Sequence, residues 1–396
     1  MDATARGNFR WHAPQVTDEL GPRIAEDSMS ASVESMPVKS PALSVPPRAA
    51  PEAGAVAGAG APALVREGIL DVAGDVLLHH GGRLPGLRIA WRLAGAANAP
   101  VVCALGGISA HRRVCLTEDP REGWWADVVG PRRALDTNSY RVLSFDYLGG
   151  SGDSSGPAHD GAAGGAGRGG NFPALSSYDQ AEALRRLLEH LRVAALAAIA
   201  GGSYGGMVAL AFAERHPDRV GRLIVIGASD RAHPLATAWR SVQRQVVRFA
   251  ADCGRAQEGL KLARALGMST YRSAEELAAR FAGPAVRDGE RFVFPIEEYL
   301  FARGGDYAAR HSAQSYVCLS ESLDLHRVDA SRIFVPTTVV AVREDQLVPL
   351  SDARALAARL PAGRVHELSS IYGHDAFLKE SQQLRPIFAS ALGSTP

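Results

Sequence analysis

The chain has 396 residues, of which 46% are hydrophobic, and its 43 basic and 42 acidic side chains give a formal net charge of +1. This length and apolar content suffice for one large domain with a substantial core. The balanced charge gives no support for a polyanionic partner such as nucleic acid. No apolar run approaches the roughly 20 residues of a membrane-spanning helix, so we expect no membrane association.

Residues 1–62 differ in composition from the rest of the chain. From Met36 to Pro62 the sequence is mostly Pro, Ala, Gly, Ser and Val, which cannot bury enough surface to offset the entropy of ordering. We therefore expect a disordered N-terminal leader over 1–62 and a folded domain over 63–396. A start site assigned too far upstream and a partner-binding tail that uses Phe9 and Trp11 are the alternatives.

Targeting and cysteine signals point to the cytoplasm. The N-terminus carries acidic residues and no hydrophobic segment, unlike a secretory signal. The four cysteines show neither C-x-x-C nor metal-ligand spacing, so we expect buried free thiols and no metal site. They are Cys103, Cys115, Cys253 and Cys318.

Strand and helix patterns alternate along the folded part. In chain order we expect antiparallel strands at 69–78 and 86–93, buried strands at 100–105 and 140–146, a helix at 178–191, and further strands at 194–199 and 222–228. This alternation predicts an α/β fold with a mostly parallel sheet flanked by helices. From about residue 230 to 333 the pattern is helical without clear strands. We expect an inserted helical cap there, which would contribute to substrate specificity.

The stretch from Ala200 to Met207 reads Ala-Gly-Gly-Ser-Tyr-Gly-Gly-Met and is the most informative part of the chain. It follows a predicted strand and precedes a helical pattern, and in this setting G-x-S-x-G forms a nucleophile elbow. Gly201 and Gly205 relieve the clashes of such a sharp turn because they lack a Cβ. The sequence therefore predicts Ser203 as a catalytic nucleophile.

A serine nucleophile requires a base and an acidic residue that orients it, here in the order Ser, Asp, His. Asp345 follows an apolar strand run at 337–342, and His374 lies in a loop after a short strand at 365–369, just before the last helix. We predict that His374 takes the proton of Ser203 and that Asp345 fixes the imidazole tautomer. His366 is the rival base, and Glu344 and Asp352 are the rival orienting acids.

The oxyanion hole should combine the N–H of Tyr204, which follows the nucleophile, with an N–H from the loop after an earlier strand. Leu105 and Gly106 begin that loop, and we take Leu105 as the second donor with Gly106 as the alternative. A G-x-G-x-x-G match at 165–170 neither follows a strand nor opens a helix. We interpret it as part of a flexible insertion rather than a dinucleotide site.

These motifs carry a family resemblance. From about Leu78 to its C-terminus the chain resembles the MetX-like homoserine O-acyltransferases, which have the α/β-hydrolase fold and act in methionine biosynthesis. The matching segments are 104–107, 202–207, 259–264, 270–272, 314–316, 345–349 and 373–378. The chain departs from the family at Gly106, where relatives often have threonine, at Tyr204 and in the glycine-rich insertion.

The resemblance implies a substrate site. Arg264 and Tyr271 would line it, and Asp375 would hold the amino group of homoserine. It also implies acyl-CoA as co-substrate, no bound cofactor and a homodimer. The chemistry agrees, because an acyl-enzyme that must react with an amino acid rather than water needs a cation, an anion and a cap that excludes solvent.

We expect a ping-pong acyl transfer from acyl-CoA to L-homoserine. The alternatives are an L-serine O-acyltransferase of cysteine biosynthesis and an esterase or thioesterase that uses the same triad. We favour succinyl-CoA over acetyl-CoA, because Arg112 and Arg113 follow the oxyanion loop and could bind a distal carboxylate. Residues 123–137 also resemble MetX-like relatives that transfer succinyl groups. Adjacent loop arginines are, however, often simply solvated, or could bind the phosphates of CoA.

Overall fold

The structure is a computed structural model that describes residues 64–119, 122–157 and 172–393. The expected leader, with Phe9 and Trp11, and the glycine-rich match at 165–170 lie outside these residues. Within them, no helix is both long and apolar enough to cross a membrane.

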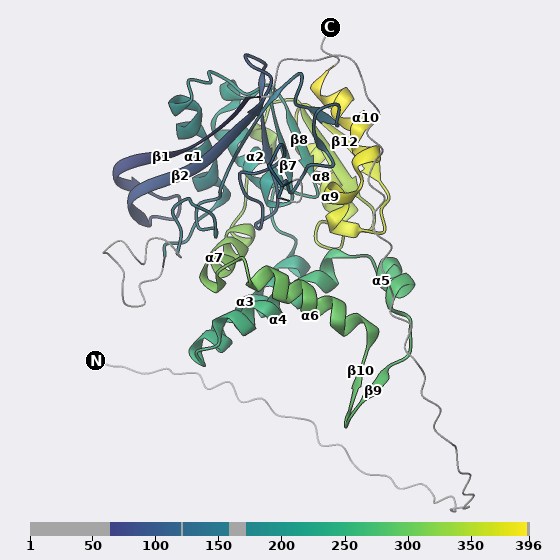
Figure 1. Cartoon of the computed structure of the whole chain (residues 1–396). Coiled ribbons are helices and arrows are strands. Elements are labelled where there is room, and N and C mark those ends of the chain that lie inside the picture. Colours follow the sequence, from purple (N-terminus) through teal and green to yellow (C-terminus); the bar gives the residue numbers. More distant parts are fainter. Residues whose placement is uncertain (1–63, 120–121, 158–171, 394–396) are drawn as a thin grey trace, which may run out of the picture. The chain divides into compact units, whose positions relative to one another are not determined.

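An eight-stranded sheet forms the centre of the described domain (Figure 1). Its spatial order is β1, β2, β6, β3, β7, β8, β11, β12. The pairs β1–β2 and β2–β6 are antiparallel and the remaining pairs are parallel, which confirms the predicted mostly parallel α/β sheet. The strands are Leu64–Leu77 (β1), Arg83–Gly95 (β2), Val101–Leu105 (β3), Arg141–Phe145 (β6), Ala198–Gly202 (β7), Leu223–Ile226 (β8), Thr337–Val342 (β11) and Gly363–Leu368 (β12).

Both faces of the sheet are buried. In β3, Cys103 and Leu105 belong to one hydrophobic cluster, whereas Val102 and Ala104 belong to the other. This alternation follows from the two-residue period of a strand and explains why the central strands read as continuous apolar runs. The helices outside the cap are Ser177–His190 (α1), Tyr204–Arg215 (α2), Leu350–Arg359 (α8), Ala376–Lys379 (α9) and Ser381–Leu392 (α10).

Five helices lie between β8 and β11 and form the cap: Pro234–Asp252 (α3), Ala256–Tyr271 (α4), Ala274–Phe281 (α5), Pro295–Ala308 (α6) and Ala313–Asp324 (α7). Figure 1 shows α3, α4 and α6 as a group distinct from the helices that flank the sheet. The insertion also contains a hairpin, Val286–Asp288 (β9) with Arg291–Val293 (β10), so the expectation of a cap without strands was wrong. Gly289 is the first of the two loop residues between the paired Asp288 and Arg291, and its φ of +60° explains the glycine at this turn position.

Two smaller features complete the description of the fold. Residues Val129–Gly130 (β4) and Leu135–Asp136 (β5) form a short two-stranded ladder within the chain between β3 and β6. All four cysteines are free, and Cys103 and Cys115 are buried as expected, but Cys253 at the end of α3 is exposed. Cys318 is half-buried, so the prediction that all four thiols are buried was wrong for Cys253 and only partly met at Cys318.

Candidate active site

Ser203 lies at the sharp turn between β7 and α2. Its φ of 54° is in the left-handed region, which is strained for a residue with a side chain. Its N–H donates to the Ile226 carbonyl (2.8 Å), and its own carbonyl accepts from the Gly206 N–H (2.9 Å), so both sides of the turn are held. A Cβ at Gly201 would lie 2.3 Å from the Gly205 carbonyl carbon, which explains the need for glycine at this close approach.

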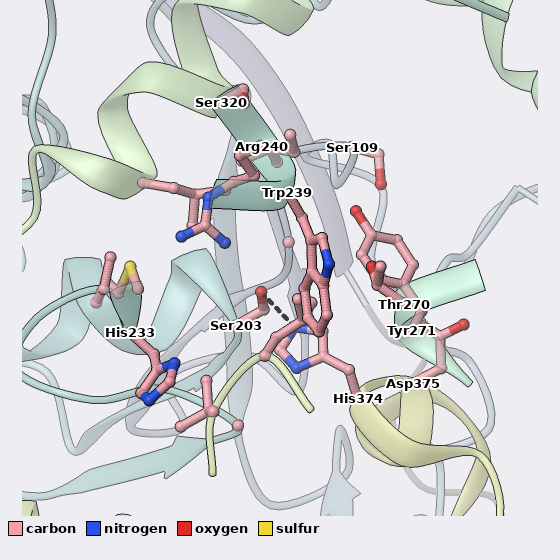
Figure 2. A pocket seen from close by; sticks show the side chains of 18 of the residues that line it. Ser109, Ser203, His233, Trp239, Arg240, Thr270, Tyr271, Ser320, His374 and Asp375 are labelled. Atoms are coloured by element: carbon pink, nitrogen blue, oxygen red, sulfur yellow. Dashed lines mark hydrogen bonds between the residues drawn. The ribbon is translucent and has the colours of Figure 1, made fainter. Parts of the chain in front are cut away.

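The structure brings Ser203, His374 and Asp345 together in one hydrogen-bonded series (Figure 2). His374 Nε2 lies 2.8 Å from Ser203 Oγ, and His374 Nδ1 lies 2.7 Å from Asp345 Oδ2. The other carboxylate oxygen of Asp345 accepts the N–H groups of Leu347 (2.8 Å) and Val348 (3.0 Å). These bonds fix the position of the Asp345 carboxylate. Because the carboxylate accepts a hydrogen bond from His374 Nδ1, the proton of the neutral imidazole is on Nδ1, and Nε2 is free to accept the proton of Ser203.

The rival residues lie elsewhere. The Glu344 carboxylate accepts the Ser370 N–H (2.8 Å) and the Ser369 hydroxyl. His366 is in β12, and Asp352 is in the first turn of α8. None of the three contacts Ser203 or His374 through a hydrogen bond within the described part of the chain.

The environment of His374 raises the pKa of its imidazole above the ordinary 6.5. Burial alone would lower this pKa, but the charge of Asp345 and the hydrogen bond to it outweigh the burial. The imidazole can therefore hold the proton that it takes from Ser203, and it is neutral, and able to act as a base, only above the raised pKa.

The loop after β3 packs directly against the nucleophile turn. The Gly106 carbonyl accepts the Gly205 N–H (2.9 Å) and the Tyr147 hydroxyl (2.8 Å), and a Cβ at Gly205 would lie 2.4 Å from the Leu105 carbonyl oxygen. The Tyr204 N–H has no hydrogen-bond acceptor among the described residues. The two expected oxyanion donors, from Leu105 and Tyr204, thus lie on segments that touch each other beside Ser203.

A cavity opens above Ser203 between the sheet and the cap. It is lined by residues from the oxyanion loop, the start of α2, three cap helices and the histidine loop. In Figure 2, Arg240 lies on one side of Ser203, and Tyr271 and Asp375 lie on the other. Arg264 also lines the cavity.

Arg264, on α4, has its guanidinium group in contact with two tyrosine rings. Its guanidinium stacks on Tyr271 (4.9 Å to the ring centroid) and Tyr307 (4.7 Å), and its Nη1 donates to the Tyr271 hydroxyl (3.2 Å). No carboxylate forms an ion pair with Arg264 in the described residues. Its charge therefore remains available to an anionic group in the cavity.

Asp375, unlike Arg264, already has an ion-pair partner. Its Oδ2 lies 3.2 Å from Arg272 Nη2, and Arg272 Nη1 lies 3.3 Å from Glu276 Oε2. Arg272 is thus shared by two carboxylates, whereas Glu276 has a second cationic partner in Arg280 (2.8 Å). Of these side chains, Asp375 is the one that lines the cavity.

Sequence reasoning missed a second cationic group on the cavity wall. Arg240 Nε (2.8 Å) and Nη2 (2.6 Å) donate to one oxygen of Asp324, and Arg244 donates to the other (2.6 Å). The three side chains are 9–11% exposed and carry one net positive charge, because two arginines share one carboxylate. The only signal in the sequence was the pair of arginines four residues apart on one face of α3.

Arg112 and Arg113, expected at the acyl pocket, do not line this cavity. The Arg112 guanidinium pairs with Asp146, with Asp153 (2.6 Å) and with Glu67 (3.6 Å). Arg113 pairs with Glu122 (3.1 Å), and its side chain is 43% exposed. Neither residue is positioned to bind an acyl carboxylate, because carboxylates from other segments already occupy Arg112 and Arg113 points to solvent.

No three His, Cys, Asp or Glu side chains cluster as metal ligands in the described ranges.

Comparison with known proteins decides the family. Residues 121–381 match a family model described as the α/β-hydrolase fold. The chain is 41% identical over 320 residues to the homoserine O-succinyltransferase of Xanthomonas campestris pv. campestris, covering 80% of this chain and 82% of the relative. This chain belongs to the MetX-like homoserine O-acyltransferase family.

Other MetX-like relatives differ in the substrates of their names. A homoserine O-acetyltransferase of Symbiobacterium thermophilum is 35% identical (76% of this chain, 88% of the relative). A serine O-succinyltransferase of Litchfieldella anticariensis is 33% identical (82% of this chain, 97% of the relative). Among solved structures, homoserine O-acetyltransferase from Bacillus anthracis aligns with a TM-score of 0.73 at 18% identity, covering 83% of this chain and 98% of that one. At such low identity this last match supports the fold alone.

A pH profile tests the role of Asp345 in this MetX-like acyltransferase. We expect kcat/KM for a neutral ester such as p-nitrophenyl acetate to fall on the acid side with an apparent pKa above 6.5. In Asp345→Asn the acid limb should move to lower pH, because the charge of Asp345 and the hydrogen bond to it no longer oppose the effect of burial, and the rate should fall by about four orders of magnitude. An acid limb at the same pH in both proteins would contradict the assigned orientation of His374.

Proposed function

We propose that this chain is an L-homoserine O-acyltransferase that uses acyl-CoA, prefers succinyl-CoA to acetyl-CoA, and works in the cytoplasm through an acyl-Ser203 intermediate. In the first half-reaction His374 takes the Ser203 proton while Ser203 Oγ attacks the thioester carbonyl. The N–H groups of Leu105 and Tyr204 stabilise the oxyanion. The carbon–sulfur bond then breaks, and His374 gives its proton to the departing CoA thiolate.

The second half-reaction repeats this chemistry with another nucleophile. His374 takes the proton of the homoserine hydroxyl, whose oxygen attacks the acyl carbonyl. The ester bond to Ser203 breaks, the serine oxygen recovers a proton from His374, and the product is O-acylhomoserine. No bound cofactor is needed for either step, because a serine, a base and oxyanion donors suffice for acyl transfer.

The charge pattern of the cavity is the observation that carries this proposal. Homoserine has a carboxylate and an ammonium group, and the cavity offers the unpaired cation Arg264 and the carboxylate of Asp375. Arg264 and Asp375 line the same cavity, so in this proposal one small amino acid contacts both groups. An esterase for neutral substrates would have no use for this pair of opposite charges.

A third charged group supports succinyl as the acyl group. Arg240, on the other side of Ser203 in Figure 2, has an Nη1 without a hydrogen-bond partner in the described residues. The Arg240–Arg244–Asp324 group has one unmatched positive charge, which suits the distal carboxylate of a succinyl group. An acetyl group would leave this buried charge unmatched. Arg240 therefore replaces Arg112 and Arg113 as the proposed acyl-pocket cation.

L-serine is the second candidate acceptor, because the Litchfieldella relative is named serine O-succinyltransferase and serine carries the same α-amino and carboxylate groups. Hydrolysis by the same triad is the third candidate activity. Incubation with succinyl-CoA and either homoserine, serine or water alone separates the three. Our proposal requires the fastest CoA release, and an O-acyl amino acid product, with homoserine.

We also propose a homodimer that uses the outer face of α3. Leu235, Val242 and Phe249 are 48%, 55% and 68% exposed and lie seven residues apart, which places them in one stripe along the helix. Such spacing is typical of helices that pair with another helix. A second copy would present the same stripe, as a two-fold interface requires.

Arg240→Gln is expected to reduce kcat/KM for succinyl-CoA by about tenfold or more, because it removes a charge-assisted contact to the acyl carboxylate. Activity with acetyl-CoA should change much less. Arg248→Gln is the matched control, since Arg248 lies on the same helix with a side chain 49% exposed, outside the cavity lining. A wild-type preference for acetyl-CoA, with equal effects of Arg240→Gln on both donors, would contradict the succinyl proposal.

Replacing Phe249 with lysine should convert the proposed dimer to a monomer, because it places a charge on the most exposed apolar side chain of the stripe. Sedimentation velocity at micromolar concentration gives the oligomeric state. Phe292→Lys on β10, where the side chain is 61% exposed, is the control and should stay dimeric. A monomeric wild-type protein would disprove the proposed interface.

A further inference from the structure

We propose that Arg272 is a positioning residue for the acceptor amino acid: it holds Asp375 so that one carboxylate oxygen remains directed into the cavity. The proposal rests on the proposed acyl transfer to homoserine and extends it to a residue behind the cavity wall. Arg272 itself does not line the cavity, whereas Asp375 does. Arg272 therefore acts through Asp375 and does not touch the substrate.

The backbone around Arg272 joins the cap to the catalytic loops. The segment connects α4 to α5, and Ser273 donates to the Ile371 carbonyl through both its hydroxyl (2.6 Å) and its N–H (3.3 Å). Gln346, next to Asp345, donates to the Arg272 carbonyl (3.1 Å). A Cβ at Gly373, where φ is +55°, would lie 2.8 Å from the Tyr271 carbonyl oxygen. The cap thus contacts both the aspartate loop and the histidine loop of the triad.

The Arg272 side chain lies between two carboxylates. It is 9% exposed, pairs with Asp375 (3.2 Å) and Glu276 (3.3 Å), and stacks over the Tyr372 ring (5.5 Å). Its Nε is buried without a hydrogen-bond partner in the described part of the chain. Arg272 thus offsets two buried carboxylates, although one of its own N–H groups stays unsatisfied. Because Asp375 lines the cavity, the arginine contacts the proposed acceptor site as well as the cap.

The contact has a direct consequence for substrate binding. Asp375 Oδ2 is held by Arg272, and no hydrogen bond from a described residue reaches Oδ1. One carboxylate oxygen is therefore fixed and the other is available to an ammonium group in the cavity. Without Arg272 the carboxylate could rotate about its side-chain torsions, and the acceptor would lose a pre-oriented partner.

His374 does not depend on this contact in the same way. It is held by the hydrogen bond from its own Nδ1 to Asp345 (2.7 Å). The loss of Arg272 should therefore impair the half-reaction that binds the amino acid and leave the formation of the acyl-enzyme largely intact. A purely structural role would impair both half-reactions together.

The test uses the full-length chain with Arg272→Gln, Arg272→Lys and Arg280→Gln. Arg280 is the matched control, because it pairs with the same Glu276 (2.8 Å) but is 44% exposed and makes no ion pair with Asp375. Active sites are counted by the burst of CoA release from succinyl-CoA without acceptor, so that misfolded protein does not affect the result. The KM for homoserine and kcat are then measured with the counted enzyme.

We expect Arg272→Gln to raise the KM for homoserine about tenfold, Arg272→Lys to recover part of this loss, and Arg280→Gln to match the wild type. The rate of the burst should change by less than about twofold. Adding Arg272→Gln to Asp375→Asn should cause no further loss, because both changes remove the same contact. The proposal would be overturned if Arg272→Gln left the KM for homoserine unchanged, or if its burst rate fell by the same factor as its kcat/KM for homoserine. It would also be overturned if the losses of Arg272→Gln and Asp375→Asn multiplied in the double variant. Failure of the proposed function is distinguishable, because the wild type would then transfer no acyl group to homoserine.

Discussion

The hydrogen bond between His374 Nε2 and Ser203 Oγ, at 2.8 Å, is the contact on which the rest of the site depends. Its two partners lie 171 residues apart, so the whole sheet is needed to bring them together. The strained φ of 54° at Ser203 points the hydroxyl out of the turn, and the carboxyl ends of β11 and β12 supply the loops for Asp345 and His374. Parallel strands make this possible, because their carboxyl ends meet at one edge.

The cap supplies charged side chains to the cavity beside Ser203, and in the proposed function these side chains select the substrate. Its helices place Arg264 and the Arg240–Arg244–Asp324 group around Ser203, and the turn after α4 holds Asp375 through Arg272. Arg264 and the Arg240–Arg244–Asp324 group have unmatched positive charge in a largely enclosed site, which in the proposed reaction favours substrate groups of opposite sign.

The sequence was sufficient for the features that depend on local pattern and chain order. Ser203, Asp345 and His374 could be placed because each follows a strand run, and the structure brings these three together. The sequence was insufficient where the ion-pair partners of a residue come from distant segments of the chain. Arg112 pairs with Asp146, Asp153 and Glu67, and Arg240 shares Asp324 with Arg244, and neither arrangement is visible from the residues beside the arginine. An arginine that is close to a catalytic motif in the sequence, such as Arg112, is not necessarily close to the active site in the structure.

Intact-protein mass spectrometry after brief exposure to succinyl-CoA tests the central claim most directly. The account predicts that the wild type gains the mass of one succinyl group, that the adduct maps to Ser203, and that homoserine removes it much faster than water does. Ser203→Ala should gain no mass. A succinyl adduct that persists in Ser203→Ala, or one that water removes as fast as homoserine, would contradict an acyltransferase that works through Ser203.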